Sequence, residues 1–227
     1  MRTQSVAKRF TDYILKEVAE GRYIIGGRLP PERELAQTLG ISRTIVRSEI
    51  AALAARGLLK IVPRRGTFIN DYWRHGSVEL LNMLLMRAEV MEKNLFVGIM
   101  ECRRLLETHF AYLAAKNRTE EGLKRLKKLI EKAEHLDDLD EIAENNFLFH
   151  QEIAYATGNA MYPLILKSME GTYINLVREF FLSNADRSLV LASHKGLCLA
   201  IEMRHAEEAQ KIMENILTYG ERIRCVW

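Results

Sequence analysis

The chain has 227 residues, of which 48% are hydrophobic, and its formal net charge is only +3. This length suffices for two modest domains, since one hydrophobic core usually serves about 100–200 residues. Four prolines and thirteen glycines argue against a sheet-rich or low-complexity chain. Three cysteines without metal-like spacing fit a reducing compartment. We find no secretory signal and no apolar run of roughly 18 residues, so we expect a cytoplasmic protein with no membrane partner.

The first 74 residues are predicted to form a small domain of three helices and a hairpin. Apolar residues recur at helical spacing over 5–20, 32–39 and 42–56, and Gly40 separates the second helix from the third. Ser42 is a suitable N-cap for the third helix. After Gly57, apolar residues alternate on both sides of the basic segment 63–66, which predicts a β-hairpin with a basic turn. This order of elements predicts a winged helix-turn-helix at residues 1–74.

The pattern from residue 75 to residue 227 is helical throughout. The breaks fall at turn-forming pairs such as Gly158-Asn159 and Ser183-Asn184, and Thr119 and either Asp138 or Asp140 are suitable caps. We therefore expect a mostly α protein in which residues 75–227 form an all-helical antiparallel bundle for ligand sensing and dimerisation. The predicted helices are 77–87, 90–116, 119–135, 139–157, 160–182, 185–203 and 205–223.

Basic residues are concentrated in the third predicted helix and the hairpin. Residues 43–65 contain five Arg and one Lys against a single acid. If Val46, Ile50 and Leu53 are buried, Arg43 and Arg47 project near the N-terminus of this helix, where recognition helices contact base edges. Arg donates two hydrogen bonds to guanine, and Arg side chains in a hairpin turn can enter the minor groove or bind phosphate. We therefore predict a contact set for operator DNA: Arg33, Ser42, Arg43, Thr44, Arg47, Arg64, Arg65, Gly66 and Thr67.

Several motifs resemble those of GntR-type transcription regulators. Residues 29–36 (LPPERELA), 40–47 (GISRTIVR) and 65–68 (RGTF) are similar to the helix-turn-helix signature and the wing tip of that family. Residues 103–107 (RRLLE), Phe149-His150, Gly158-Asn159 and His194 resemble the helical effector domain of its FadR (FCD) branch. The resemblance covers nearly the whole chain. It implies operator contacts by Arg33, Arg43, Thr44, Arg47 and Gly66.

The segments 155–173 and 185–189 are similar to the fatty-acid-responsive members of that branch. This similarity implies a long-chain acyl-CoA or fatty acid as the effector. Because guanidinium binds carboxylates and phosphates bidentately, Arg103, Arg104 and Arg178 are candidate effector-binding residues, and Tyr173 is a candidate pocket aromatic. The alternative is that the three Arg residues form surface ion pairs and that Tyr173 belongs to the ordinary core.

A metal site is a second possibility for the helical domain. Asn146 and His150 share a helix face, and His194 lies among apolar residues of another predicted helix. Neutral imidazole is a good ligand for zinc or nickel. The resemblance to metal-binding members of the family implies a ligand set of an acid, a His four residues later and two further His. This chain departs from that set twice, because Asn146 stands in the position of the acid and Ile216 in the position of the last His. Asn146, His150 and His194 therefore either hold one divalent ion, with or without a small carboxylate, or line a pocket for an organic ligand.

These observations favour a ligand-responsive DNA-binding regulator that binds a palindromic operator as a homodimer. Repression relieved by the effector is the default expectation. The alternative is a helical metalloenzyme with an appended DNA-binding domain, but the chain has no His-Glu-x-x-His and no paired Glu-x-x-His motif. An architectural nucleoid protein would not need so large a C-terminal domain. We therefore expect a regulator and not an enzyme.

Overall fold

The computed structural model describes residues 6–85, 93–183 and 185–224, which divide into two compact units, Met1–Val90 and Met91–Trp227. This division falls after the predicted boundary at residues 74/75. The reason is that Leu80 of helix α5 (Val78–Leu85) is buried in the hydrophobic core of the N-terminal unit. Predicted helix ends at residue 5 and at residues 86–87 and 90–92 lie outside the described residues. The two units are described separately below.

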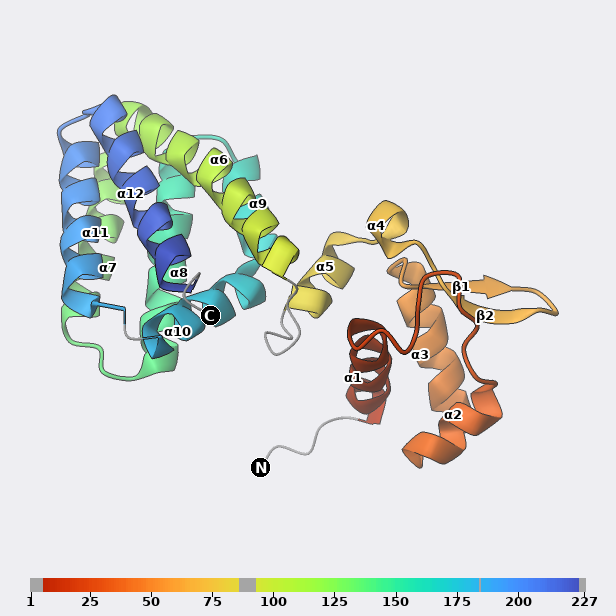
Figure 1. Cartoon of the computed structure of the whole chain (residues 1–227). Helices are drawn as coiled ribbons and strands as arrows, with labels where there is room; N and C mark the ends of the chain where they lie inside the picture. The colour runs from red at the N-terminus through yellow and green to blue at the C-terminus, as the bar shows by residue number, and fades with distance from the viewer. Residues whose placement is uncertain (1–5, 86–92, 184, 225–227) are drawn as a thin grey trace. The chain divides into compact units, whose positions relative to one another are not determined.

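The N-terminal unit has the predicted order of elements. Helices α1 (Val6–Ala19), α2 (Glu32–Leu39) and α3 (Arg43–Ala55) precede strands β1 (Leu59–Val62) and β2 (Gly66–Ile69). Helix α3 packs against α1, α2 and β1 (Figure 1). The short helix α4 (Tyr72–His75) was not predicted and spans the predicted boundary at residues 74/75. The core of this unit includes Phe10, Ile14, Leu35, Val46, Ile50, Leu53, Leu58, Leu59 and Ile69.

Local sequence explains how α2 and α3 are joined. Gly40 follows α2 with φ 62°, a left-handed conformation that glycine adopts without steric cost, and its N–H reaches the carbonyl oxygens of Ala36 and Gln37. Two residues later the Ser42 hydroxyl accepts a hydrogen bond from the Ile45 N–H at 3.3 Å. The tight turn between α2 and α3 thus follows from a glycine C-cap and a serine N-cap, and the predicted Ser42 cap is confirmed.

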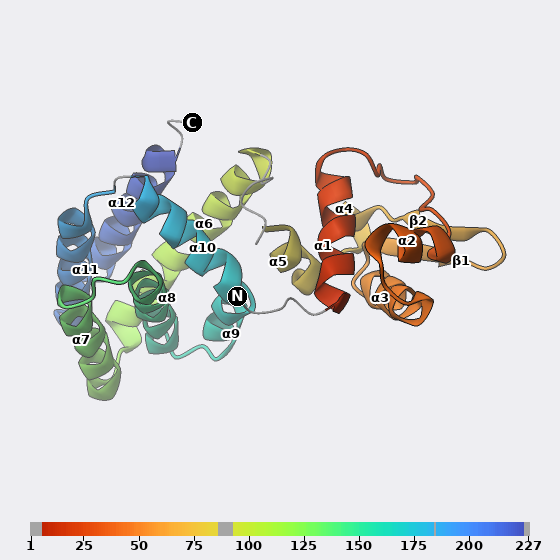
Figure 2. The same ribbon diagram turned by 90° about the horizontal axis from the view of Figure 1, so that it is seen from below.

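The hairpin pairs β1 and β2 antiparallel, from Leu59 opposite Ile69 to Val62 opposite Gly66. The segment before α2 adds to this small sheet, because Arg28 forms an isolated bridge with Phe68. Figures 1 and 2 show that the hairpin turn projects beyond the helices of its own unit. The wing is therefore held at its base on both sides and is exposed at its tip.

The described part of the C-terminal unit contains helices only, so the predicted mostly α fold with a winged helix-turn-helix is confirmed. Thr119 and Asp138 cap α7 and α8 as predicted. The predicted single helix 160–182 is in fact two, separated at Met169, where φ is −110° and ψ is 10°. In the sequence, Gly171 stands two residues after that break, in the first turn of α10, and was not used as a signal. The helices are α6 (Lys93–Asn117), α7 (Glu120–Glu134), α8 (Leu139–Ala156), α9 (Met161–Ser168), α10 (Glu170–Leu182), α11 (Arg187–Glu202) and α12 (Ala206–Arg224).

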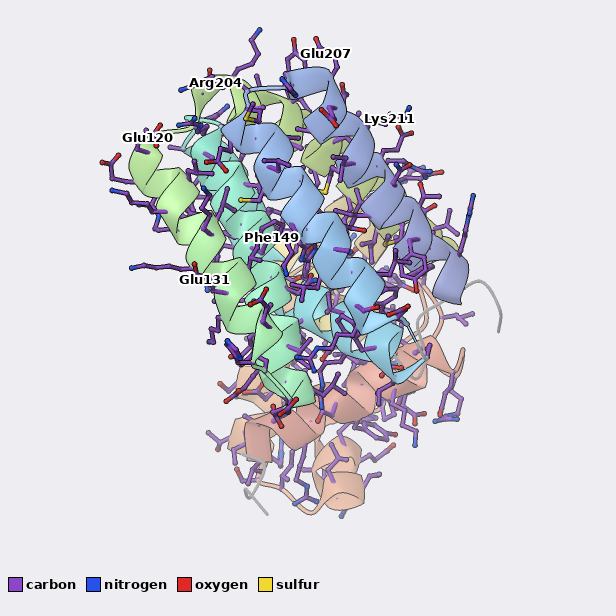
Figure 3. The ribbon with its side chains drawn as sticks, turned by 90° about the vertical axis from the view of Figure 1, so that its left-hand side faces the viewer. Glu120, Glu131, Phe149, Arg204, Glu207 and Lys211 are labelled. Atoms are coloured by element: carbon purple, nitrogen blue, oxygen red, sulfur yellow. The ribbon has the colours of Figure 1, made fainter. Side chains whose placement is uncertain are left out.

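The five long helices of this unit, α6, α7, α8, α11 and α12, form a bundle around one apolar core. Helix α12 lies along α6, α7 lies along α8, and α11 contacts α7, α12 and α6. Figure 3 shows Phe149 inside the bundle and Glu120, Glu207 and Lys211 at its periphery. Phe110, Phe147 and Phe149 are each no more than 1% exposed. Among the described helices, none is long and apolar enough to cross a membrane.

Candidate DNA-binding surface and effector cavity

The N-terminus of α3 presents the predicted recognition residues to solvent. Val46, Ile50 and Leu53 are buried, as predicted. Arg43 and Thr44 are consequently exposed in the first turn of the helix. Exposed basic residues in this turn can reach base edges when the helix enters a major groove. Ser42 is exposed too, but its hydroxyl already caps the helix.

Arg47 is exposed and forms an ion pair with Glu32 at the start of α2. Its Nε and a terminal nitrogen lie 3.3 and 3.2 Å from the two carboxylate oxygens of Glu32. Exposed pairs of this kind are worth only about 0.2–1 kcal/mol. The pair therefore orients the Arg47 guanidinium without preventing it from exchanging Glu32 for a base or a phosphate. Arg33, the next residue of α2, is exposed as well.

The turn of the wing holds an arginine in a costly backbone conformation. The Arg65 N–H donates to the Val62 carbonyl at 3.0 Å, and between them Arg64 has φ 61°. A left-handed conformation costs about 1–2 kcal/mol for a residue with a side chain, and Gly or Asn would fill the position more cheaply. An Arg at this position indicates a use for its charge. Arg64 and Arg65 are exposed, and Gly66 and Thr67 are partly exposed beside them.

Arg28 is a basic residue of the wing that sequence reasoning missed. A Cβ built on Gly66 would lie 2.9 Å from Nε of Arg28, so the guanidinium of the exposed Arg28 lies directly against the wing glycine. Arg28 precedes the LPPERELA motif by one residue, but only the pairing of its segment with β2 brings it to the wing. Gly66 therefore both adopts φ 113° and leaves space for this side chain.

The C-terminal unit contains a partly open cavity of about 240 Å³ lined by five helices, α6, α8, α10, α11 and α12. Most of the side chains that line it are apolar, and the polar ones include the three predicted metal-site residues. The lining residues are Phe96, Met100, Arg103, Asn146, His150, Leu176, Val177, Phe180, Leu189, Val190, Ser193, His194, Asn215, Ile216, Leu217, Tyr219 and Gly220.

A buried charged cluster forms one part of the cavity wall. The Glu107 carboxylate, 1% exposed, accepts from Nε of Arg103 at 2.6 Å and lies 2.5 Å from Nδ1 of His150. Arg103 also donates to the Tyr173 hydroxyl at 2.6 Å. Burial raises the pKa of Glu107, but the charges of Arg103 and His150 outweigh burial and lower this pKa to about 2. The carboxylate therefore stays ionised. It links α6 to α8 through His150, and it links α6 to α10 through Arg103 and Tyr173.

His194 lies beside this cluster without a hydrogen-bond partner for its Nε2 among the described residues. It is 6% exposed and stacks on Phe149, with ring centroids 4.3 Å apart. Burial, and then the charge of His150, keep the pKa of His194 well below its ordinary value. The side chain is thus a neutral imidazole whose buried Nε2 makes no hydrogen bond within the described part of the chain.

The structure brings together only part of the predicted effector site. Arg103, Asn146, His150 and His194 line the cavity. Arg104 instead pairs with Glu221 at 3.2 Å, and Arg178 pairs with Asp140 at 2.8 Å. These two Arg residues, like Tyr173, are not among the residues that line this cavity. The prediction also overlooked Glu107, although the residue stands in the RRLLE motif.

The donor atoms of the cavity only partly suit a metal ion. The ring centroids of His150 and His194 are 5.4 Å apart, and two imidazoles on one tetrahedral ion would be separated by about 5 Å. However, Asn146 offers a neutral amide, and Ile216 offers no donor. Within the described residues no three His, Cys, Asp or Glu side chains form a group that could hold a metal. The donor set is therefore weaker than the acid and three His of metal-binding relatives.

A winged helix-turn-helix with a basic face, joined to a helical domain with a ligand-sized cavity, defines a class of DNA-binding regulators. Comparison with known families agrees. Residues 7–69 match the model of the bacterial regulatory proteins of the gntR family, and residues 98–219 match the FCD domain. The chain therefore belongs to the GntR family of transcription regulators, in the branch that carries an FCD domain.

Individual relatives cover the whole chain. It is 27% identical over 227 residues to the fatty acid metabolism regulator protein of Proteus mirabilis, and 29% identical over 228 residues to that of Escherichia coli, covering 92% of each. Among solved structures, Lar, which controls the Listeria monocytogenes agr system, has a TM-score of 0.69 at 18% identity, with both chains fully covered. Streptococcus agalactiae GntR has a TM-score of 0.51 at 24% identity, covering 95% of this chain and 99% of its own. These structures share the fold.

Proposed function

We propose that this regulator acts in the cytoplasm as a homodimeric repressor whose operator binding is weakened by an acyl-chain effector, an acyl-CoA or a fatty acid. The observation that carries the proposal is the largely apolar cavity of about 240 Å³ lined by five helices. Ligand sites are typically such apolar cavities with a few placed polar groups. Relatives named fatty acid metabolism regulator align with the whole chain, which supports an acyl chain as the ligand. All of these relatives are regulators, and we propose no enzyme activity.

The proposed operator contacts divide into two kinds. Arg43, Thr44 and Arg47 would read base edges from the first turn of α3, and Arg33 would bind the backbone or a neighbouring base. The wing would bind phosphate or the minor groove through Arg64, Arg65, Gly66 and Thr67, with Arg28 as an additional cation. Two copies related by a two-fold axis would read the halves of a palindrome.

Regulation requires that the effector distinguish two states of the dimer. An effector that binds the DNA-free state more tightly lowers DNA affinity by the ratio of its two affinities. The cavity is lined by α6 and α12, among other helices, and these two pack along each other. Filling the cavity would therefore act on the packing of this pair.

The proposed binding of a palindromic operator by a homodimer is tested by selecting duplexes from a random pool with the full-length protein. We expect a palindromic consensus and, by light scattering, a dimer mass. Arg43→Ala should lose the preference for one base in each half-site, because that change removes the direct contact. Arg74→Ala is the matched control, since Arg74 is an exposed Arg of α4, which follows the end of β2 remote from the wing turn. A monomer, or a selection without a consensus, would contradict this part.

The proposed acyl-chain effector is tested by native mass spectrometry of the protein purified from its host. A retained acyl-CoA or fatty acid supports the proposal. A retained metal ion supports the second candidate, in which Asn146, His150 and His194 hold a zinc- or nickel-type ion together with a small carboxylate. One observation favours that candidate: Glu107 lies on Nδ1 of His150, and metal-bound His residues commonly donate their second nitrogen to a carboxylate. Elemental analysis without stoichiometric metal, before and after incubation with zinc or nickel, would eliminate it.

A further inference from the structure

Arg47 differs from the other Arg residues of the predicted operator-contact set, because it has a carboxylate partner. Its Nε and Nη2 lie 3.3 and 3.2 Å from the two oxygens of Glu32. Within the described part of the chain, the four other Arg residues of that set form no ion pair with an acid. A guanidinium whose charge is balanced by a carboxylate attracts phosphate less strongly than a free one. Arg47 is therefore the cation of this set that is least suited to the DNA backbone.

The ion pair occupies only one side of the Arg47 guanidinium. An Arg side chain has five N–H donors, one on Nε and two on each terminal nitrogen. Glu32 accepts one from Nε and one from Nη2. Of the remaining three, one on each terminal nitrogen points outward along the free end of the group, and these two donors are parallel. The Arg47 side chain is 73% exposed. Its free end can therefore make a bidentate contact while Glu32 stays bound.

The fold brings this free end to the surface that would face DNA. Arg47 lies one turn after Arg43 on the same face of α3. Side chains of a helix point back toward its N-terminus, so the Arg47 guanidinium lies toward the first turn. Glu32 is the first residue of α2, which packs against α3 (Figures 1 and 2). The carboxylate thus holds Arg47 from a second helix, whose position is fixed by that packing.

We propose that Glu32 is a positioning residue that holds Arg47 for bidentate recognition of one guanine in each operator half-site. Guanine presents two acceptors in the major groove, O6 and N7, which match the two parallel donors of Arg47. Adenine presents a donor beside N7, so it matches only one of them. A supported side chain also loses less rotamer freedom on binding than an unsupported one. The inference rests on the proposed function, because it concerns the same operator.

The pair is weak in the free protein but should strengthen in the complex. An exposed ion pair contributes little in water. When α3 enters the major groove, water is displaced from around Arg47 and Glu32, and the attraction between their charges increases as the local dielectric constant falls. The carboxylate also repels phosphate oxygens, which disfavours a backbone contact by Arg47. Both effects direct the guanidinium to a base.

The test measures base preference by fluorescence anisotropy with the full-length protein. The duplexes are the selected operator and variants in which each base pair of a half-site is replaced in turn. The wild type should prefer guanine at one position by about 5- to 150-fold, the usual discrimination of one bidentate contact. Arg47→Ala should remove the preference at that position. Glu32→Gln should reduce it there by at least about three-fold, because the guanidinium is then no longer held by a carboxylate.

Two further variants separate positioning from general charge effects. Glu34→Gln is the matched control, because Glu34 is an exposed acid in the same first turn of α2. Its removal changes the charge near DNA by the same amount, so overall affinity should change as in Glu32→Gln while the guanine preference stays at the wild-type level. The double variant Glu32→Gln/Arg47→Ala should have the same base preferences as Arg47→Ala alone, because Glu32 acts through Arg47.

Four results would overturn the inference. The first two are an unchanged guanine preference in Glu32→Gln and an equal loss of preference in Glu34→Gln. The third is a further loss in the double variant, which would mean that Glu32 contacts a base itself. The fourth is an Arg47→Ala protein that binds all the duplexes equally less well, as loss of a phosphate contact would produce.

The same data distinguish this inference from the proposed function. A palindromic consensus together with any of the four results leaves the proposed operator binding intact and refutes only the role of Glu32. A wild-type selection without a consensus refutes the proposed operator binding, and this inference with it, since no base preference then exists.

Discussion

Replacing Glu107 by Gln should strongly destabilise the helical unit. The substitution keeps the shape of the side chain but removes the negative charge that Arg103 and His150 share. The Arg103 guanidinium would then stay buried without a counter-charge, and breaking a buried ion pair in this way costs about 3–5 kcal/mol. A second calculation agrees: a pKa of about 2 in the folded protein, against 4.5, corresponds to about 3 kcal/mol.

The same pair predicts a pH dependence. Because folding lowers the pKa of Glu107, its stabilising contribution is complete above pH 4.5 and is lost as the pH falls from 4.5 towards 2. The free energies of unfolding of wild type and Glu107→Gln should therefore differ by about 3 kcal/mol at pH 7.5 and converge in acid. Urea denaturation followed by circular dichroism, over a series of pH values, measures both quantities.

An exposed pair provides the control. Glu134 of α7 pairs with Lys195 of α11, and both side chains are exposed, so Glu134→Gln should change the stability little. A Glu107→Gln protein within about 1 kcal/mol of the wild type at pH 7.5 would refute the argument, because the buried charge would then cost far less than expected. So would a difference that persists unchanged at pH 2.

Other predictions concern DNA binding and stability of the N-terminal unit, and the stability of helix α6. Arg43→Ala should weaken operator binding by about 1–3 kcal/mol in fluorescence anisotropy, whereas unchanged affinity would remove Arg43 from the interface. Arg65→Ala should weaken binding to all sequences and reduce the salt slope by about 1, and an effect limited to one operator base would contradict a phosphate contact. Gly57→Ala should lower the melting temperature, because φ is 86° and a Cβ would meet the His75 carbonyl at 2.0 Å. Gly98→Ala, in an open position of α6, should raise it slightly, and the opposite order would contradict the described packing.

The sequence predicted what depends on local signals. The spacing of Val46, Ile50 and Leu53 fixes which face of α3 is buried, and hence which residues are exposed. Gly40 and Ser42 define the turn before it by their own backbone and side-chain preferences. These signals act within a few residues, so the winged helix-turn-helix could be read from the pattern alone.

The cavity could be predicted only in part, because its walls come from helices far apart in the sequence. Asn146, His150 and His194 were found because each stands on an apolar helix face. Nothing local distinguishes Arg103, which faces the cavity, from Arg104, which pairs with Glu221. The helix break at Met169 was missed because the nearest glycine, Gly171, lies inside the following helix.

The coupling between the cavity and the operator is the central claim, and one titration tests it directly. The full-length protein is titrated into a labelled duplex of its selected operator, with and without a long-chain acyl-CoA, at fixed salt. The proposed function predicts a dimer that binds the duplex and loses at least about ten-fold in affinity with the ligand, a coupling within the usual 1–3 kcal/mol. An acyl-CoA that binds the protein but leaves operator affinity unchanged would contradict it.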